Sequence, residues 1–114
     1  MPDLKVIVHI SDRDKWTSAL KQVEALIEEH PPGGVEVIVL ADIFAGAVCV
    51  ACDRGLKSRM EEFVGAGHRI IACEESLRGF NLRPEALPEF METVPNVLAE
   101  IIKRQLQGFH YVKI

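Results

Sequence analysis

Short runs of branched apolar residues alternate along the chain with longer segments whose apolar positions recur at helical spacing. Runs of about four to eight apolar residues between turn-forming residues are typical of buried strands, and a helical repeat is typical of amphipathic helices. The strands predicted in this way lie at residues 4–10, 35–40, 69–73, 90–94 and 109–114. The predicted helices lie at residues 16–27, 45–52, 56–64 and 94–108, and a short helical turn is expected from residue 74.

The order of these elements predicts the fold class. Strands that alternate with helices favour an α/β protein with a mostly parallel sheet and helices on both of its faces. The chain has 114 residues, which is enough for one domain that buries about two thirds of its unfolded surface. We therefore expect residues 1–114 to form a single α/β domain.

The helix expected at 94–108 has two distinct faces. The apolar positions expected to face the protein interior are Val97, Leu98, Ile101, Ile102 and Leu106. The polar positions expected to face water are Glu100, Lys103, Arg104 and Gln107. The apolar stretch 37–52 and the tail 109–114 hold more apolar surface than one small sheet needs, so we expect the chain to form a homo-oligomer.

Composition excludes several classes of protein. An apolar fraction of 48% is too high for a disordered chain. A net charge of −4 and dispersed basic residues argue against nucleic acid as a partner. The apolar stretch from Val35 to Cys52 is too short for a membrane span, which takes about 20 apolar residues. Asp42 would also lie near the middle of such a span, so we expect no membrane insertion.

The cysteines and the first residues of the chain favour a cytoplasmic protein. The three cysteines are odd in number and are not placed like a disulfide framework, which indicates a reducing compartment. The first residues lack the basic segment and the following apolar segment of a secretory signal, so we expect none.

Cys73 is the leading candidate for chemistry, because it ends the apolar run 69–73 and precedes the polar residues Glu74 to Arg78. Reactive groups of α/β sheets gather beyond the carboxyl ends of strands. The amides of a helical turn starting at Glu74 would favour the thiolate by about 0.3–1 kcal/mol, and Arg78 could add to this. Glu74 and Glu75 oppose it, because a like charge at about 4 Å costs about 1 kcal/mol in water. The alternative is a cysteine that is only packed in the core.

Two further polar residues follow or interrupt predicted strands. His9 is foremost a hydrogen-bonded core histidine, with a proton carrier as the alternative. Asp42 is foremost a helix cap or turn residue, with a catalytic carboxylate as the alternative. The residues that we expect to line a binding site around Cys73 are His9, Asp42, Glu74, Glu75, Ser76 and Arg78.

Cys49 and Cys52 form a Cys-X-X-Cys pair. A structural zinc ion needs four ligands and no second pair is present. A thioredoxin-like pair would open a long helix, which the residues 53–55 interrupt. We expect two buried structural cysteines, with redox or sulfur exchange with Cys73 as the first alternative and a metal ion as the second. No glycine-rich phosphate loop is present, so no cofactor is expected.

Three segments together resemble the DsrE/DsrF-like family of small α/β proteins, which is associated with intracellular sulfur oxidation and sulfur relay. The first is Val8-His9-Ile10-Ser11-Asp12, with Trp16 shortly after it. The second runs from Ala72 to Arg78 and is preceded by Gly65-Ala66-Gly67, and the third runs from Arg104 to Lys113. They span nearly the whole chain in the expected order.

This resemblance implies a three-layer α/β/α fold with a five-stranded, largely parallel sheet, and homo-oligomers that are commonly trimers or hexamers. In sulfur-relay members, a cysteine at the position of Cys73 carries sulfur as a persulfide. The chain departs from the family where Glu75 replaces a usual amide residue and where Gln107 replaces a usual acidic residue. The pair Cys49 and Cys52 is not a family feature.

The resulting functional expectation is a sulfur-handling protein. Cys73 would accept sulfane sulfur from a donor protein and pass it, as a persulfide, to an acceptor thiol. The alternative is a non-catalytic homo-oligomeric module that binds a small ligand or a protein, in which Cys73 is structural. Rapid alkylation of a native thiol would distinguish the first from the second.

Overall fold

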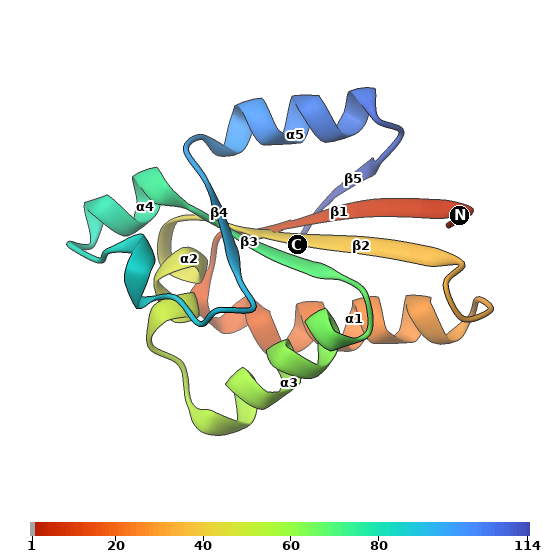
Figure 1. Ribbon diagram of the computed structural model, residues 1–114, viewed down its shortest axis with the longest axis horizontal. Coiled ribbons are helices and arrows are strands. Elements are labelled where there is room, and N and C mark those ends of the chain that lie inside the picture. The colour runs from red at the N-terminus through yellow and green to blue at the C-terminus, as the bar shows by residue number, and fades with distance from the viewer. Residues whose placement is uncertain (1) are drawn as a thin grey trace.

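Five parallel strands form one sheet in the order β4-β3-β2-β1-β5. The computed structural model describes residues 2–114 (Figure 1). The strands are β1 (Leu4–Ile10), β2 (Val35–Ala41), β3 (Arg69–Cys73), β4 (Glu92–Val94) and β5 (His110–Lys113). The helices are α1 (Trp16–Glu28), α2 (Ile43–Val50), α3 (Arg54–Gly65), α4 (Glu74–Gly79) and α5 (Val97–Leu106), with short 3-10 turns η1 (Arg13–Lys15) and η2 (Pro84–Ala86).

The predicted α/β fold is confirmed, and the sheet is entirely parallel. Helices α1 and α3 cover one face of the sheet and α5 covers the other, which gives three layers (Figure 1). The short helices α2 and α4 lie beyond the carboxyl ends of β2 and β3. Within residues 2–114, no helix is both long enough and apolar enough to cross a bilayer.

The path of the chain explains the strand order. From β1 the chain moves strand by strand to β4, and α5 then carries it back over the opposite face to β5, beside β1. Crossovers between parallel strands are right-handed. A connection that runs back across the sheet in the opposite direction therefore places its helix on the opposite face. Ligands of such sheets bind at the carboxyl ends of the strands near this change of direction.

The two faces of the sheet bury cores of different size. The larger core lies beneath α1 and α3, where Trp16, Leu20 and Met60 are fully buried against β1, β2 and β3. The indole nitrogen of Trp16 also donates a hydrogen bond to the carbonyl oxygen of Ala45, 3.0 Å away, which ties α1 to α2. The smaller core lies beneath α5 and consists of Ile7, Ile38, Leu40, Ile71 and Phe109.

The expected orientation of the last helix is wrong for most of its residues. Leu98, Ile102 and Leu106 are 66%, 51% and 84% exposed, while Glu100 and Arg104 are buried. Only Val97 and Ile101 pack partly against the small core, as expected. The helix therefore turns charged side chains toward the sheet and leaves an apolar stripe, Leu98–Ile102–Leu106, facing outward.

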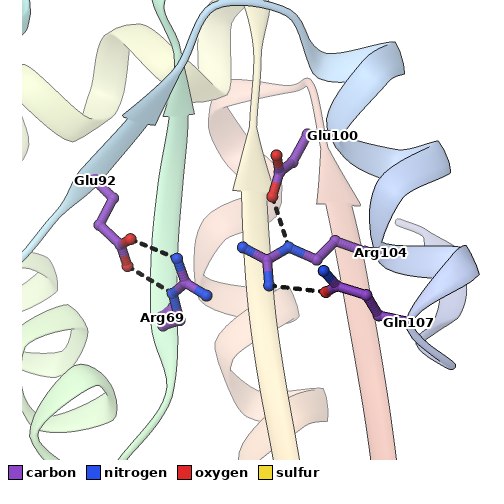
Figure 2. A network of polar contacts seen from close by, with 5 residues as sticks. All are labelled: Arg69, Glu92, Glu100, Arg104 and Gln107. Carbon is purple, nitrogen blue, oxygen red and sulfur yellow. Dashed lines mark hydrogen bonds and ion pairs between the residues drawn. The ribbon is translucent and has the colours of Figure 1, made fainter.

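A polar network holds α5 in this orientation (Figure 2). Arg104 Nε donates to Glu100 Oε2 at 2.6 Å, and Arg104 Nη1 donates to Gln107 Oε1 at 3.3 Å. The Arg104 guanidinium also lies over the ring of Phe109, 5.7 Å from its centroid. Because these groups satisfy one another beneath the helix, the buried charges fix which face of α5 meets the sheet.

A second ion pair on the same face of the sheet joins β3 to the edge strand β4 (Figure 2). Arg69 donates two hydrogen bonds to Glu92, at 2.7 and 2.5 Å. These hydrogen bonds lower the pKa of Glu92 from its ordinary value and raise that of Arg69. The bidentate pair secures a strand of only three residues.

Several element boundaries differ from those predicted. The helix expected at 45–52 begins earlier, at Ile43, and ends at Val50. The interruption expected at 53–55 is a helix start, because Asp53 accepts a hydrogen bond from the Leu56 amide at 2.8 Å and Gly55 lies within α3. The last helix is shorter than expected and begins after Asn96.

Candidate functional site

An open pocket of about 330 Å³ lies at the carboxyl edge of the sheet, between β2, β3 and the start of α5. It includes the sequence-predicted residues Asp42, Cys73, Glu75 and Ser76. Its remaining lining comes from the first residues of α5 and the position before it, Asn96, Val97 and Leu98. The pocket thus lies where the sheet topology predicts a ligand site.

Cys73 enters this pocket as the last residue of β3 and the N-cap of α4. Its backbone is extended, with φ −82° and ψ 120°, and its side chain makes no capping hydrogen bond. The residue is 3% exposed. Ala41 pairs with Ala72 in the β2–β3 register, so one further residue along each strand brings Asp42 beside Cys73. The fold therefore places a thiol and a carboxylate together.

Three helices begin at the pocket, because Asp42, Cys73 and Asn96 are the N-cap residues of α2, α4 and α5. Peptide dipoles give each helix N-terminus a partial positive charge. Asn96 caps its own helix, since its Oδ1 accepts a hydrogen bond from the Ala99 amide at 3.0 Å. The arrangement therefore brings the partial positive charges of three helix N-termini to a pocket that also contains the carboxylates of Asp42 and Glu75.

Asp42 occupies a cap position without capping its helix. The Ile43 amide at the start of α2 instead donates to Ser76 Oγ, 2.7 Å away. Asp42 has no side-chain capping bond, and its Oδ1 accepts a hydrogen bond from Ser11 Oγ at 2.6 Å. The carboxylate is therefore committed to neighbouring side chains rather than to the helix end.

The backbone beside the pocket is strained at Ile43. Its φ of +51° lies in the left-handed region, which branched side chains adopt at a cost of about 1–3 kcal/mol. The Ile43 side chain is about half exposed, as is that of Phe44, whose ring contacts the ring of Phe80 with centroids 5.3 Å apart. Backbone strain of this kind clusters at functional sites.

His9 links Asp42 to the last strand. His9 Nε2 lies 3.0 Å from Asp42 Oδ1, and His9 Nδ1 lies 2.8 Å from the hydroxyl of Tyr111. The His9–Asp42 contact has ion-pair distance without hydrogen-bond alignment. Partial burial, and secondly the negative charge of Asp42, raises the pKa of Tyr111. Tyr111 is thus a neutral phenol at neutral pH, and its hydroxyl shares a hydrogen bond with Nδ1 of His9.

The other predicted residues lie at different distances from the pocket. Glu75 lines it and is exposed. Glu74 Oε2 accepts a hydrogen bond from Thr93 Oγ1 at 2.7 Å, so its carboxylate is held at β4. Arg78 is exposed on the last turn of α4 and is not among the residues that line the pocket.

Cys49 and Cys52 line a second pocket, of about 380 Å³, on the side of α2 that faces Lys57 and residues 86–89. Burial, with a smaller contribution from Cys52, raises the pKa of the Cys49 thiol to about 12. The pKa of Cys52 is also raised, by burial and then by Asp53. Both thiols are therefore protonated at neutral pH. Across residues 2–114, no three His, Cys, Asp or Glu side chains are grouped so that they could hold a metal ion.

Sequence reasoning missed Ser11, Asn96 and Tyr111 as parts of the site. Ser11 follows β1 as Asp42 follows β2, and this matching position was a usable signal. Asn96 is a good capping residue and caps α5, but it lay inside the helix predicted from residue 94. Tyr111 gave no signal, because its contact with His9 depends on β5 pairing with β1 across more than 100 residues.

Comparison with protein-family models and with curated proteins finds no match to this chain. Among solved structures, the chain is similar to MTH1491 from Methanobacterium thermoautotrophicum, described as a protein of unknown function, with a TM-score of 0.86 and 23% identity over 97% of this chain and 99% of that one. It is also similar to the YchN protein from E. coli, with a TM-score of 0.71 and 12% identity over 97% of this chain and 99% of that one.

A third similar structure is BT1422 from Bacteroides thetaiotaomicron, described as a conserved protein of unknown function. Its TM-score is 0.54, with 16% identity over 95% of this chain and 94% of that one. At these identities the likeness extends to the fold alone. The chain therefore shares its three-layer α/β fold with these proteins, and its chemistry has to be inferred from the site.

Proposed function

We propose that this protein is a sulfur carrier of the DsrE/DsrF-like type, which holds sulfane sulfur as a persulfide on Cys73. The observation that carries the proposal is the position of Cys73. Cys73 is the last residue of an inner strand, the residue at which a helix starts and a residue that lines a pocket. Helix N-termini lower the free energy of a nearby thiolate, which is the nucleophilic form of cysteine.

The transfer is a displacement at sulfur. The Cys73 thiolate attacks the outer sulfur of a donor persulfide, R–S–SH, and a new S–S bond forms as the donor S–S bond breaks. Cys73 then carries –S–SH, and the donor leaves as R–S⁻, which takes up a proton. An acceptor thiolate attacks the outer sulfur of Cys73 in the same way, so no oxidant or reductant is consumed.

Cys73 is the best placed of the three cysteines for this role. The raised pKa values of Cys49 and Cys52 make them poor nucleophiles at neutral pH. They also line a different pocket, so this part of the proposal assigns them a structural role. All three cysteines are free, which supports the reducing cytoplasm as the setting in which the protein acts.

Native-state alkylation tests the reactivity that the proposal needs. With a small neutral reagent near neutral pH, we expect the peptide that contains Cys73 to be modified first, before the peptide that contains Cys49 and Cys52. Modification of Cys73 only after denaturation would remove the proposal. The alternative, a binding module with a packed Cys73, is favoured by the low exposure of that residue and predicts this second result.

The same proposal includes assembly with further copies of the chain, as a trimer or hexamer. The apolar stripe of α5, Leu98–Ile102–Leu106, supports it, because these side chains recur at four-residue spacing and are at least half exposed. Contiguous exposed apolar surface of this kind marks interaction sites. Leu98 also lines the Cys73 pocket, so a subunit on this stripe would border the proposed site.

A further inference from the structure

The charged side chains that line the Cys73 pocket are both carboxylates. Asp42 and Glu75 contribute them, and the lining contains no lysine, arginine or histidine. Arg78, which follows Glu75 on α4, stands outside the lining. The pocket therefore offers an approaching sulfur compound two negative charges and no cationic side chain.

The helix N-termini around the pocket only partly offset these charges. A helix N-terminus corresponds to about half a positive charge, whereas each carboxylate carries a full negative charge. Two of the N-termini already hydrogen-bond side-chain oxygens, through the Ile43 amide to Ser76 and through the Ala99 amide to Asn96. An incoming molecule therefore meets a pocket whose two full negative charges outweigh the partial charges of the helix ends.

Glu75 is the more effective of the two carboxylates. Asp42 is contacted by His9 and accepts a hydrogen bond from Ser11. Glu75 is exposed in the first turn of α4 and has no ion-pair partner within residues 2–114. Its charge is therefore available to act on a molecule that approaches the pocket.

We propose that Glu75 and Asp42 select sulfur donors by charge, so that Cys73 exchanges sulfur with neutral or cationic persulfides and discriminates against anions such as thiosulfate. This inference rests on the sulfur-carrier function. The donor class that fits is a persulfide on a cysteine of another protein with basic or uncharged neighbours. Thiosulfate, a small dianion, is repelled by both carboxylates.

Charged methanethiosulfonates test the selection without any sulfur donor. The Cys73 thiolate attacks their sulfenyl sulfur, an S–S bond forms, and methanesulfinate leaves. The rates at which the trimethylammonium-ethyl and sulfonato-ethyl reagents modify the peptide that contains Cys73 are measured. Each rate is then divided by the rate of the same reagent with a small neutral thiol, which removes the difference in intrinsic reactivity. We expect the cationic reagent to be favoured about tenfold, and less at high salt because the charges are screened. A ratio near one, or a preference for the anion, overturns the proposal.

A pair of matched variants assigns the effect to the pocket. Glu75→Gln keeps the size of the side chain and removes its charge, so the ratio should fall about threefold. Glu61→Gln removes the same charge from α3, on the opposite face of the sheet, and should leave the ratio unchanged. An equal fall in both variants, or in neither, contradicts the selection by Glu75.

Sulfur uptake separates this inference from the proposed function. With a neutral persulfide donor the wild type should be loaded, and with thiosulfate at the same concentration it should not. Equal loading from both donors overturns the charge selection and leaves the carrier function standing. A failure of all donors, together with a cationic preference toward methanethiosulfonates, removes the carrier function and keeps the charged pocket.

Discussion

Cys73 begins α4 without capping it, and serine is among the best residues at that position. The hydroxyl of Cys73→Ser can accept a hydrogen bond from an α4 amide, which offsets the burial of a polar atom. We predict that the free energy of unfolding of this variant lies within about 1 kcal/mol of the wild type, as measured by urea titration. A loss of more than about 2 kcal/mol would instead identify Cys73 as a packing residue.

His68 provides a pH-dependent element of stability at the opposite end of the sheet. Its Nδ1 accepts a hydrogen bond from the Val37 amide at 3.1 Å, and its ring stacks on Phe63. Burial lowers the pKa of His68 from 6.5, and Glu36 opposes the shift only in part. The folded protein therefore prefers neutral His68, and this contribution is complete above the unfolded pKa and is lost as pH falls through the lower folded pKa.

We predict that acidification destabilises the wild type more than a variant without this imidazole. His68→Asn keeps an acceptor near the Val37 amide and does not titrate. The free energies of unfolding of both proteins are compared by urea titration above and below pH 6.5. The advantage of the wild type should shrink at the lower pH, and parallel losses in the two proteins would refute the role of His68.

The residue patterns that predicted the site worked best where the chemistry is local. Cys73 ends one strand, and Glu75 and Ser76 follow it directly, so their shared place in the pocket was visible in the sequence. The carboxylate of Glu74 was also predicted there, and a long-range contact with Thr93 draws it away. Such contacts depend on the strand order, which no local pattern determines.

At the scale of elements, the strands were predictable because central parallel strands are apolar on both faces. The location of α5 was also predictable, and its orientation was not. Periodicity separates an apolar from a polar face, but it does not say whether the apolar face meets the protein's own sheet or another molecule. The buried pair Glu100 and Arg104 determines the answer, and a pair at this spacing is equally typical of an exposed helix surface.

The buried ion pair of α5 leads to a prediction about paired substitutions. Arg104→Met leaves Glu100 buried without its partner, which should cost about 3–5 kcal/mol of unfolding free energy. Adding Glu100→Leu removes the stranded charge, so the double variant should recover most of the loss. Urea titration of both variants measures the effect, and a double variant that is less stable than Arg104→Met would show that Glu100 has other partners.

At the scale of the whole molecule, the apolar stripe of α5 is the interface that we propose for an assembly of several copies of the chain. We predict that Ile102→Glu converts the assembly to folded monomers, because a charge at the centre of an apolar interface cannot be buried unpaired. Light scattering gives the mass, and circular dichroism checks the fold. Gln22→Glu adds the same charge to the exposed surface of α1 and should leave the mass unchanged.

A wild-type protein that is monomeric across micromolar concentrations would remove this account of the stripe. An assembly that survives Ile102→Glu would place the interface elsewhere, for example at the exposed side chains of Tyr111 and Val112 on the edge strand β5. The two outcomes differ in wild-type mass, so one series of measurements separates them.

The most direct test of the central claim is the mass of the native protein after exposure to a neutral persulfide donor. Wild type and a Cys49→Ala/Cys52→Ala variant should each gain one sulfur atom, which reducing agent removes and which a peptide digest places on Cys73. Cys73→Ser should gain none while remaining folded. If Cys73→Ser takes up sulfur as the wild type does, or if the wild type takes up none, then Cys73 is not a sulfur carrier.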